Sequence, residues 1–417
     1  MFALFSLSSF VLWLISFPMA GFLLKDFDLL PYFLAGHIGG FVSILFLRAN
    51  FYNLAPVFLS VTMLLTASFT YLDLKPITMF FIGFFSSYFA VLVGHFLTES
   101  PKKRDLLGLV LGNVGVSALY FLPVKDYYKF LIISFLPSIN FYRKPITFSF
   151  KTIEKRIYLR FLLSIFVLYI TGGLMYKNIM EIYSIQAFVF GIEVFFYAFA
   201  VLLAYFMLMK NTKEEHLLVS AVISYALAYS LMHFEHKMFL NIMMYLIQFG
   251  FGFADAYLLY TLINLRNPLL VFPVGFSTVC VSIMCGYYLG KLISHPDFLI
   301  AVGNIILVSF SLYTFYVAKT EKVIKEKMPK ITQKVGAKEF IESLCVDLQK
   351  YDKRLSRREI EVMSLMLEGK SNEEIAKILG ISISSVREYS RRALEKIDKD
   401  REELSHAYME WLKGKSL

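Results

Sequence analysis

The chain has few cysteines and none of the common catalytic motifs, and both shortages exclude classes of protein. It holds three cysteines in 417 residues. Cys280 and Cys285 lie in an apolar stretch and Cys345 stands alone, so the spacing predicts neither a disulfide framework nor a zinc site. The sequence contains no phosphate-binding glycine loop, nucleophile elbow or metal-ligand spacing. We therefore expect no enzyme, no cofactor and no bound metal.

Charged residues are also scarce, and they are unevenly distributed. They make up 18% of the chain, whereas about 25% is usual in soluble proteins. The first 318 residues carry 34 charged residues, and the last 99 carry 40. This shift predicts three parts: a membrane body at 1–318, a basic juxtamembrane linker with an amphipathic helix at 319–350, and a small soluble domain at 351–417.

The body consists of apolar runs of the length that crosses a bilayer, which is about 20 residues. The expected fold is all-α, a polytopic membrane bundle of about twelve helices. Short loops on one side carry 13 Lys and Arg and those on the other side carry 7, which predicts that both termini are cytoplasmic. The predicted spans are 2–24, 29–47, 51–72, 76–98, 106–123, 127–142, 157–176, 182–209, 217–234, 238–265, 269–290 and 298–318.

A basic loop at 143–156 separates six spans from six, and this arrangement resembles the major facilitator architecture. The resemblance covers the body and is one of topology. The motif of acidic, basic and glycine residues that this family has after its second helix is not matched. Positions 46–53 read FLRANFYN, with Arg48 as the only charge. The resemblance therefore favours the facilitator-like 6+6 fold more than it favours transport.

Few ionisable side chains lie in the apolar runs, chiefly His37, His95, Glu193 and Asp255. A charge buried in a bilayer is costly and indicates a functional site by default. Glu193 is expected near the middle of its span and Asp255 well inside its own, both facing a central cavity. His37, Glu193 and Asp255 are candidates for sensing an unknown small-molecule ligand. The alternative, favoured for the histidines, is that these groups pair with tyrosines or backbone and only fix packing.

Aromatic residues are abundant, and the linker is basic. The 43 Phe and 26 Tyr are expected mostly to face lipid, without a ligand role. The lysines between 319 and 334 are expected to be attracted to the headgroups of the lipid bilayer. The apolar face of the helix that follows is expected to pack on the terminal domain or on a second copy of the chain. That face consists of Phe340, Ile341, Leu344, Cys345 and Leu348.

Local chemistry divides the tail between 355 and 397 into three short helices. Two S-x-x-E capping boxes and two glycine stops define the first two helices, and a serine begins the third. These residues are Ser356 with Glu359, Ser371 with Glu374, Gly369, Gly380 and Ser382. In the third helix Arg387 and Arg391 share the outward face. A scaffold helix, a glycine turn and an exposed basic helix are typical of a helix-turn-helix.

The same segment resembles the LuxR/GerE-type DNA-binding domain, without a gap over its three helices. Tyr389 stands where the family usually has histidine, and Ser385 replaces the usual threonine. The matching residues are Leu355, Ser356, Arg358, Glu359, Val362, Met363, Glu368, Gly369, Lys370, Ser371, Asn372, Glu374, Ile375, Ala376, Leu379, Ile381, Ser382, Ser385, Val386, Arg387 and Lys396.

The resemblance implies a bacterial transcription regulator that binds double-stranded promoter DNA. Together with the facilitator-like body, it implies a location in the cell (inner) membrane. We expect the DNA-contacting residues to be Ser385, Arg387, Glu388, Arg391 and Arg392. A fourth helix is expected after Lys399, which would complete a small cytoplasmic four-helix domain. In the family that helix pairs two subunits, so a homodimer is expected. Its apolar side consists of Leu404, Ala407, Tyr408 and Trp411.

Three functions are compatible with this sequence. The leading hypothesis is a membrane-bound regulator whose helix bundle senses a small molecule or membrane state and whose tail binds DNA. The second is a secondary transporter of the facilitator type that carries a regulatory DNA-binding tail. The third treats the tail as a protein-interaction module, with Arg387, Arg391 and Arg392 as an ordinary solvated basic face.

Overall fold

In the computed structural model every regular element among the described residues is a helix, and the predicted all-α class is confirmed. The chain divides into two compact units, residues 1–313 and 314–417. The predicted span at 298–318, apart from positions 303, 304 and 310, lies outside the described residues, as do the linker at 319–334 and most of the loop at 143–156. The described residues are 1–19, 23, 24, 26–99, 103–142, 155–234, 236–265, 267–292, 303, 304, 310, 337, 339–344, 355–398, 400, 403–405, 407, 408 and 411.

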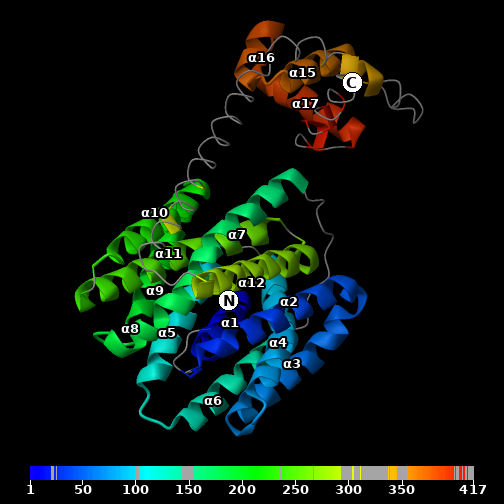
Figure 1. Ribbon diagram of the computed structural model, residues 1–417. Coiled ribbons are helices and arrows are strands. Elements are labelled where there is room, and N and C mark those ends of the chain that lie inside the picture. The colour runs from blue at the N-terminus through cyan, green and yellow to red at the C-terminus, as the bar shows by residue number, and fades with distance from the viewer. Residues whose placement is uncertain are drawn as a thin grey trace. The chain divides into compact units, whose positions relative to one another are not determined.

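The membrane body contains helices α1 to α12 in its described part (Figure 1). Irregular or 3-10 turns join most of them, and a π-helical turn, Ile15–Met19, extends the first. The helices are α1 Phe2–Leu14, α2 Leu30–Phe46, α3 Phe51–Ser68, α4 Lys75–Glu99, α5 Leu107–Phe121, α6 Asp126–Ser134, α7 Lys155–Asn178, α8 Met180–Gln186, α9 Glu193–Met209, α10 Glu215–Leu231, α11 Lys237–Asn264 and α12 Pro268–Leu292.

The length and hydropathy of these helices show a multi-pass membrane protein. In the described residues six helical segments are long and apolar enough to cross a bilayer, and three shorter apolar helices accompany them. The six are Phe2–Met19, Phe27–Phe46, Arg48–Tyr71, Lys75–Glu99, Lys237–Asn264 and Pro268–Leu292. The three are Tyr158–Leu174, Glu193–Met209 and Glu215–Leu231.

The segment predicted as one span at 182–209 is interrupted. Helix α8 ends at Gln186, and α9 begins at Glu193 after an irregular stretch. Gly191 in this stretch has a φ of +94°, a left-handed conformation that glycine adopts without a steric penalty. Glu193 is therefore the first residue of a helix, and the prediction that it lies near the middle of a span is wrong.

Helices α1 to α6 pack mainly on one another, and so do helices α7 to α12. The two groups meet where α2 contacts α12 and where α5 contacts α9. The crossing of α7 and α12 is close, because a Cβ on Gly173 would lie 2.0 Å from the carbonyl oxygen of Ile283, and one on Gly286 would lie 2.1 Å from that of Ile170. Small residues allow such backbone contact between membrane helices, where dispersion forces replace the hydrophobic effect.

The second unit has its own apolar core around α15 (Arg357–Leu367), α16 (Asn372–Leu379) and α17 (Ile383–Ile397). The core also includes residues from the helical stretch at 339–344 and from the helical residues between 403 and 411. Phe340 and Ile341 are buried in it. The prediction that this amphipathic helix packs on the terminal domain is therefore confirmed. The fully buried residues include Ile341, Val362, Met363, Ile375, Val386, Ala393 and Leu404.

Candidate functional site

Both predicted capping boxes are present in the tail, and they fix the starts of α15 and α16. The hydroxyl of Ser356 accepts from the backbone N–H of Glu359 at 3.3 Å, and the Glu359 carboxylate accepts from the N–H of Ser356 at 2.6 Å. Ser371 and Glu374 repeat the arrangement at 3.2 and 2.9 Å. Each pair satisfies two backbone donors that a helix start leaves without intrahelical partners. Local sequence therefore sets the boundaries of these helices.

A tight turn presents α17 to solvent. Gly380 ends α16 with a φ of +63° and a left-handed backbone. The hydroxyl of Ser382 then accepts from the backbone N–H of Ser385 at 3.0 Å and caps α17. The Oγ of Ser385 lies 2.8 Å from the Oγ of Ser382, so this predicted DNA contact also takes part in the cap.

Helix α17 has a buried apolar side and an exposed basic side. Val386, Ala393 and Ile397 are buried in the core of the tail. The opposite side presents Arg387, Arg391 and Arg392, all of them exposed. An amphipathic helix that follows a tight turn and exposes arginines is the geometry with which a recognition helix enters the major groove.

The arginines of this side differ in their partners. Arg391 donates to Glu388 at 2.8 Å and to Glu395 at 2.6 Å, and Arg392 donates to Glu388 at 2.7 Å. Hydrogen bonds from these two guanidinium groups lower the pKa of Glu388 to about 2. The bonds that Arg391 donates to Glu388 and Glu395 raise the pKa of Arg391. Arg387 forms no ion pair with any described residue, so it is available without breaking one.

An ion pair between a buried carboxylate and a partly exposed lysine joins the start of α15 to the end of α17. The Lys396 ammonium donates to both carboxylate oxygens of Glu359, whose side chain is 3% exposed. Burial would raise the pKa of Glu359, but the bonds from Lys396 and from Ser356 outweigh it and hold that pKa below its ordinary value. The Glu359 side chain therefore both caps α15 and fixes the direction of α17. The sequence prediction assigned it only the cap.

The predicted dimer helix uses its apolar side within its own domain. Leu404 and Tyr408 are buried, and the ring of Phe340 lies 5.3 Å from that of Tyr408 and 5.6 Å from that of Trp411, measured between centroids. Pairing of two chains through this helix would therefore use its other side or displace the helix that carries Phe340.

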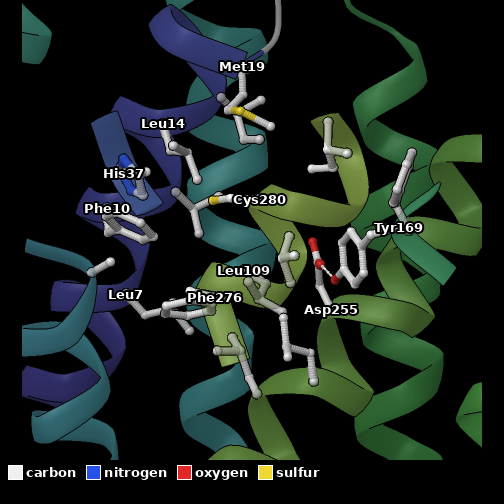
Figure 2. A pocket seen from close by; sticks show the side chains of 18 of the residues that line it. Leu7, Phe10, Leu14, Met19, His37, Leu109, Tyr169, Asp255, Phe276 and Cys280 are labelled. Carbon is white, nitrogen blue, oxygen red and sulfur yellow. Dashed lines mark hydrogen bonds between the residues drawn. The ribbon is translucent and has the colours of Figure 1, made fainter. Parts of the chain in front are cut away.

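A cavity of about 190 Å³ lies inside the membrane body, and all three predicted sensing residues line it. His37 comes from α2, Glu193 from the start of α9, and Asp255 from α11. Figure 2 shows His37 and Asp255 at opposite sides of this cavity, with Cys280 between them. Most of the remaining lining residues are apolar, and Asn113 of α5 is one of the few polar ones. The fold thus brings together residues that lie up to 218 positions apart.

The carboxylate of Asp255 ties three helices together. Its Oδ1 accepts a hydrogen bond from the Tyr169 hydroxyl of α7, and its Oδ2 accepts from the Tyr197 hydroxyl of α9 at 2.6 Å (Figure 2 shows the first). Both tyrosines are buried, so the prediction that tyrosines mostly face lipid is wrong for this pair. Tyr197 follows Glu193 by one helical turn, so the sequence could have indicated that the two side chains lie on the same face of the helix. Tyr169 offered no such signal.

The contacts of Glu193 are those of a helix start. Its Oε2 accepts from the backbone N–H of Gly191 at 2.8 Å and from the Tyr183 hydroxyl at 2.9 Å. A negative charge at this end of α9 is favourable, because unpaired N–H groups give a helix N-terminus partial positive charge. At the other end, Lys103 donates to the carbonyl of Leu208 at 2.5 Å. Helix α9 is thus charge-complemented at both ends.

The two histidines have ordinary packing partners. His37 lies between the rings of Phe33 and Phe41, and its Nδ1 is 3.4 Å from the Ser86 hydroxyl. The Nδ1 of His95 forms a hydrogen bond with the Tyr52 hydroxyl, and its Nε2 lies 3.2 Å from a carboxylate oxygen of Glu99. Of the two, His37 lines the cavity and His95 does not. No group of three or more potential metal ligands occurs in the described residues.

Comparison with known families assigns the tail of the chain. The family model described as "Bacterial regulatory proteins, luxR family" matches residues 353–405. The DNA-binding transcriptional activator EvgA of Escherichia coli K12 is 44% identical over 59 residues, and so is that of Shigella flexneri. These matches cover 14% of this chain and 28% of EvgA, so the chain spans little more than a quarter of the length of these relatives.

Among solved structures, the chain is similar to FucP, a Major Facilitator Superfamily transporter in the outward conformation. The TM-score is 0.49 at 11% sequence identity, over 75% of this chain and 98% of FucP. A likeness at this level says nothing of transport. Residues 353–405 are a LuxR-type helix-turn-helix DNA-binding domain, and one chain joins it to a multi-pass body of membrane helices.

Proposed function

We propose that the protein is a membrane-bound transcription regulator. Its body senses a small molecule or membrane state, and its tail binds promoter DNA through α17. The observation that carries the proposal is the exposed arginine side of α17 behind the Gly380 turn, inside the domain matched by the luxR family model. EvgA, which is similar in this segment, is named a DNA-binding transcriptional activator.

Arg387 is the first contact proposed on DNA, because no ion pair with a described residue has to break before it binds. Arg391 and Arg392 bind DNA by giving up their hydrogen bonds to Glu388 and donating to a phosphate or a base edge instead. Glu388, once released, is placed to accept from a cytosine amino group. Ser385 lies at the start of α17, where the backbone of the helix end favours a phosphate.

The sensing role rests on the Asp255 cluster. Asp255, Tyr169 and Tyr197 join α11, α7 and α9 through two hydrogen bonds at the cavity wall. A ligand that altered those bonds would change how three helices pack against each other, which is a differential contact of the kind an allosteric signal requires. In this proposal both termini are cytoplasmic, and the signal changes pairing of two tails into the dimer that binds DNA.

Binding of DNA by the isolated second unit, residues 314–417, tests this proposal, because that unit has a core of its own. We expect salt-sensitive binding that weakens in Arg387→Ala and Arg391→Ala. Replacement of an arginine that reads a base should cost about 1–3 kcal/mol of binding free energy and relax the preference at one base pair. Replacement of one that binds a phosphate should reduce the salt slope of binding by about one. Arg357→Ala is the matched control, since this exposed arginine lies on α15.

Two outcomes would replace the proposal. If circular dichroism shows all variants folded and none differs from the parent in affinity or salt slope, α17 does not contact DNA and the tail is a protein-interaction module. If proteoliposomes that contain the full chain take up a substrate along an imposed gradient, the body is a transporter with a regulatory tail. A sensor should bind its ligand without net flux.

A further inference from the structure

The cavity of the membrane body carries acidic groups and no strongly basic one. Its described lining contains Glu193 and Asp255 but neither lysine nor arginine, and His37 is its one titratable nitrogen base. Its carboxylates lie in walls made mostly of apolar and aromatic side chains. In such surroundings an acidic cavity attracts a cation and repels an anion, because apolar walls screen charge less than water does.

Among the described residues, neither carboxylate has a charged partner. The groups that donate to Asp255 are the neutral hydroxyls of Tyr169 and Tyr197. Those that donate to Glu193 are the Tyr183 hydroxyl and a backbone N–H. In the part of the chain that the structure describes, no lysine, arginine or histidine forms an ion pair with either. Hydrogen bonds orient a carboxylate, but a charge inside a membrane body normally faces a counter-charge.

The lining favours an organic cation over a metal ion. A metal such as Ca²⁺ requires six to eight oxygen ligands, and both oxygens of Asp255 already accept from tyrosines. The described residues contain no group of three metal ligands. By contrast, the rings of Phe251, Tyr197 and Phe276 line the same cavity as Asp255. Aromatic faces attract alkylammonium groups, and this attraction strengthens where water is excluded.

The cavity volume limits the ligand to a small molecule. An engineered apolar cavity of about 150 Å³ holds benzene, and the cavity here is about 190 Å³. The space therefore suits a compact ammonium compound slightly larger than benzene, with its charge at Asp255 and its alkyl groups against the rings.

We infer that this cavity binds a small alkylammonium cation, with Asp255 as its counter-ion and the aromatic rings of the lining around its alkyl groups. The inference of a binding site depends on the cavity alone. The role of its ligand as the signal for transcription rests on the function proposed above.

Calorimetry on the full chain in detergent tests the inference with three probes of nearly equal shape. Choline carries a positive charge, 3,3-dimethyl-1-butanol is its neutral carbon analogue, and 3,3-dimethylbutyrate carries a negative charge. We expect choline to bind about tenfold or more tightly than the alcohol, as a charge-assisted contact requires, and the butyrate not to bind.

Variants then assign the site. Asp255→Asn should remove the preference for choline over the alcohol, and Asp255→Glu should keep it. Asp28→Asn is the matched control, because Asp28 also accepts a hydrogen bond from a tyrosine, Tyr287, but does not line the cavity. This control should bind choline as the parent does.

Three results would overturn the inference. Equal binding of choline and the alcohol by the parent, or no binding of choline, excludes a cation site whether or not any variant folds. Equal preference for choline in the parent and in a folded Asp255→Asn protein removes Asp255 from the site. None of these results touches DNA binding by the tail, so failure of this inference and failure of the proposed regulator are distinguishable.

Discussion

The Lys396 ammonium lies 2.7 and 2.9 Å from the two oxygens of Glu359, across 37 residues of the tail. Lys396 belongs to the last turn of α17 and Glu359 to the first turn of α15. The pair therefore holds the candidate recognition helix against its scaffold helix, so that the position of Arg387 and Arg391 depends on it.

Lys396→Met should destabilise the tail. It leaves the Glu359 carboxylate buried without its charged partner, which costs about 1–3 kcal/mol. Thermal unfolding of residues 314–417 measures the loss. Combined with Glu359→Gln, which keeps the capping box, much of that stability should return. If both single variants unfold at the parent's temperature, the pair does not position α17.

The stability of the tail should fall in acid through the same pair. The pKa of Glu359 is lowered in the folded tail, while in the unfolded chain it has its ordinary value of about 4.3. The contribution is therefore present above the unfolded pKa and is lost as pH falls through the folded pKa. Unfolding from pH 7 to pH 3 should show this loss in the parent and a smaller one in Glu359→Gln. Equal loss in both proteins would contradict it.

Glu388→Gln should strengthen DNA binding. The change removes the carboxylate that both Arg391 and Arg392 contact and takes one negative charge off the face of α17. Affinity for DNA of any sequence should rise, and the salt slope should steepen by up to about one. Glu361→Gln, which removes a similar partner of two arginines on α15, should change the affinity less. The amide oxygen of the variant can still accept from a cytosine amino group, so weaker binding of every sequence by Glu388→Gln would contradict this prediction.

Glu193→Gln and Asp255→Asn should separate sensing from DNA binding. Neither residue belongs to the tail, so the isolated unit at 314–417 is unaffected by definition. In the full chain these changes should alter the transcriptional response to the signal at equal membrane abundance. We expect the larger effect from Asp255, which joins three helices, than from Glu193, whose contacts are those of a helix start. An unchanged response in the double variant would make both carboxylates packing groups.

The tail could be predicted residue by residue because its signals are local. Ser356 and Glu359 are three residues apart, and Gly380 acts through its own φ. The body could be predicted only as a set of apolar segments. The contact between Tyr169 and Asp255 spans 86 residues, and apolar periodicity gives no information about partners at that separation.

The position of Glu193 shows a second limit of prediction from the sequence. Hydropathy continues through the run that contains Gly191, so the sequence predicted one span where the structure has a break. The positive φ of Gly191 is what permits the break, and glycine alone does not specify it. The ion pair of Lys396 was missed for the reason that applies to Tyr169, since its partner is distant in sequence.

Genome-wide footprints of the full chain in its own membrane test the central claim most directly. The parent should protect a small set of promoters, and the Arg387→Ala/Arg391→Ala double variant should lose them at equal abundance. Footprints that are identical in parent and variant, or no footprints from the parent in any growth condition, would contradict a regulator that binds DNA through α17.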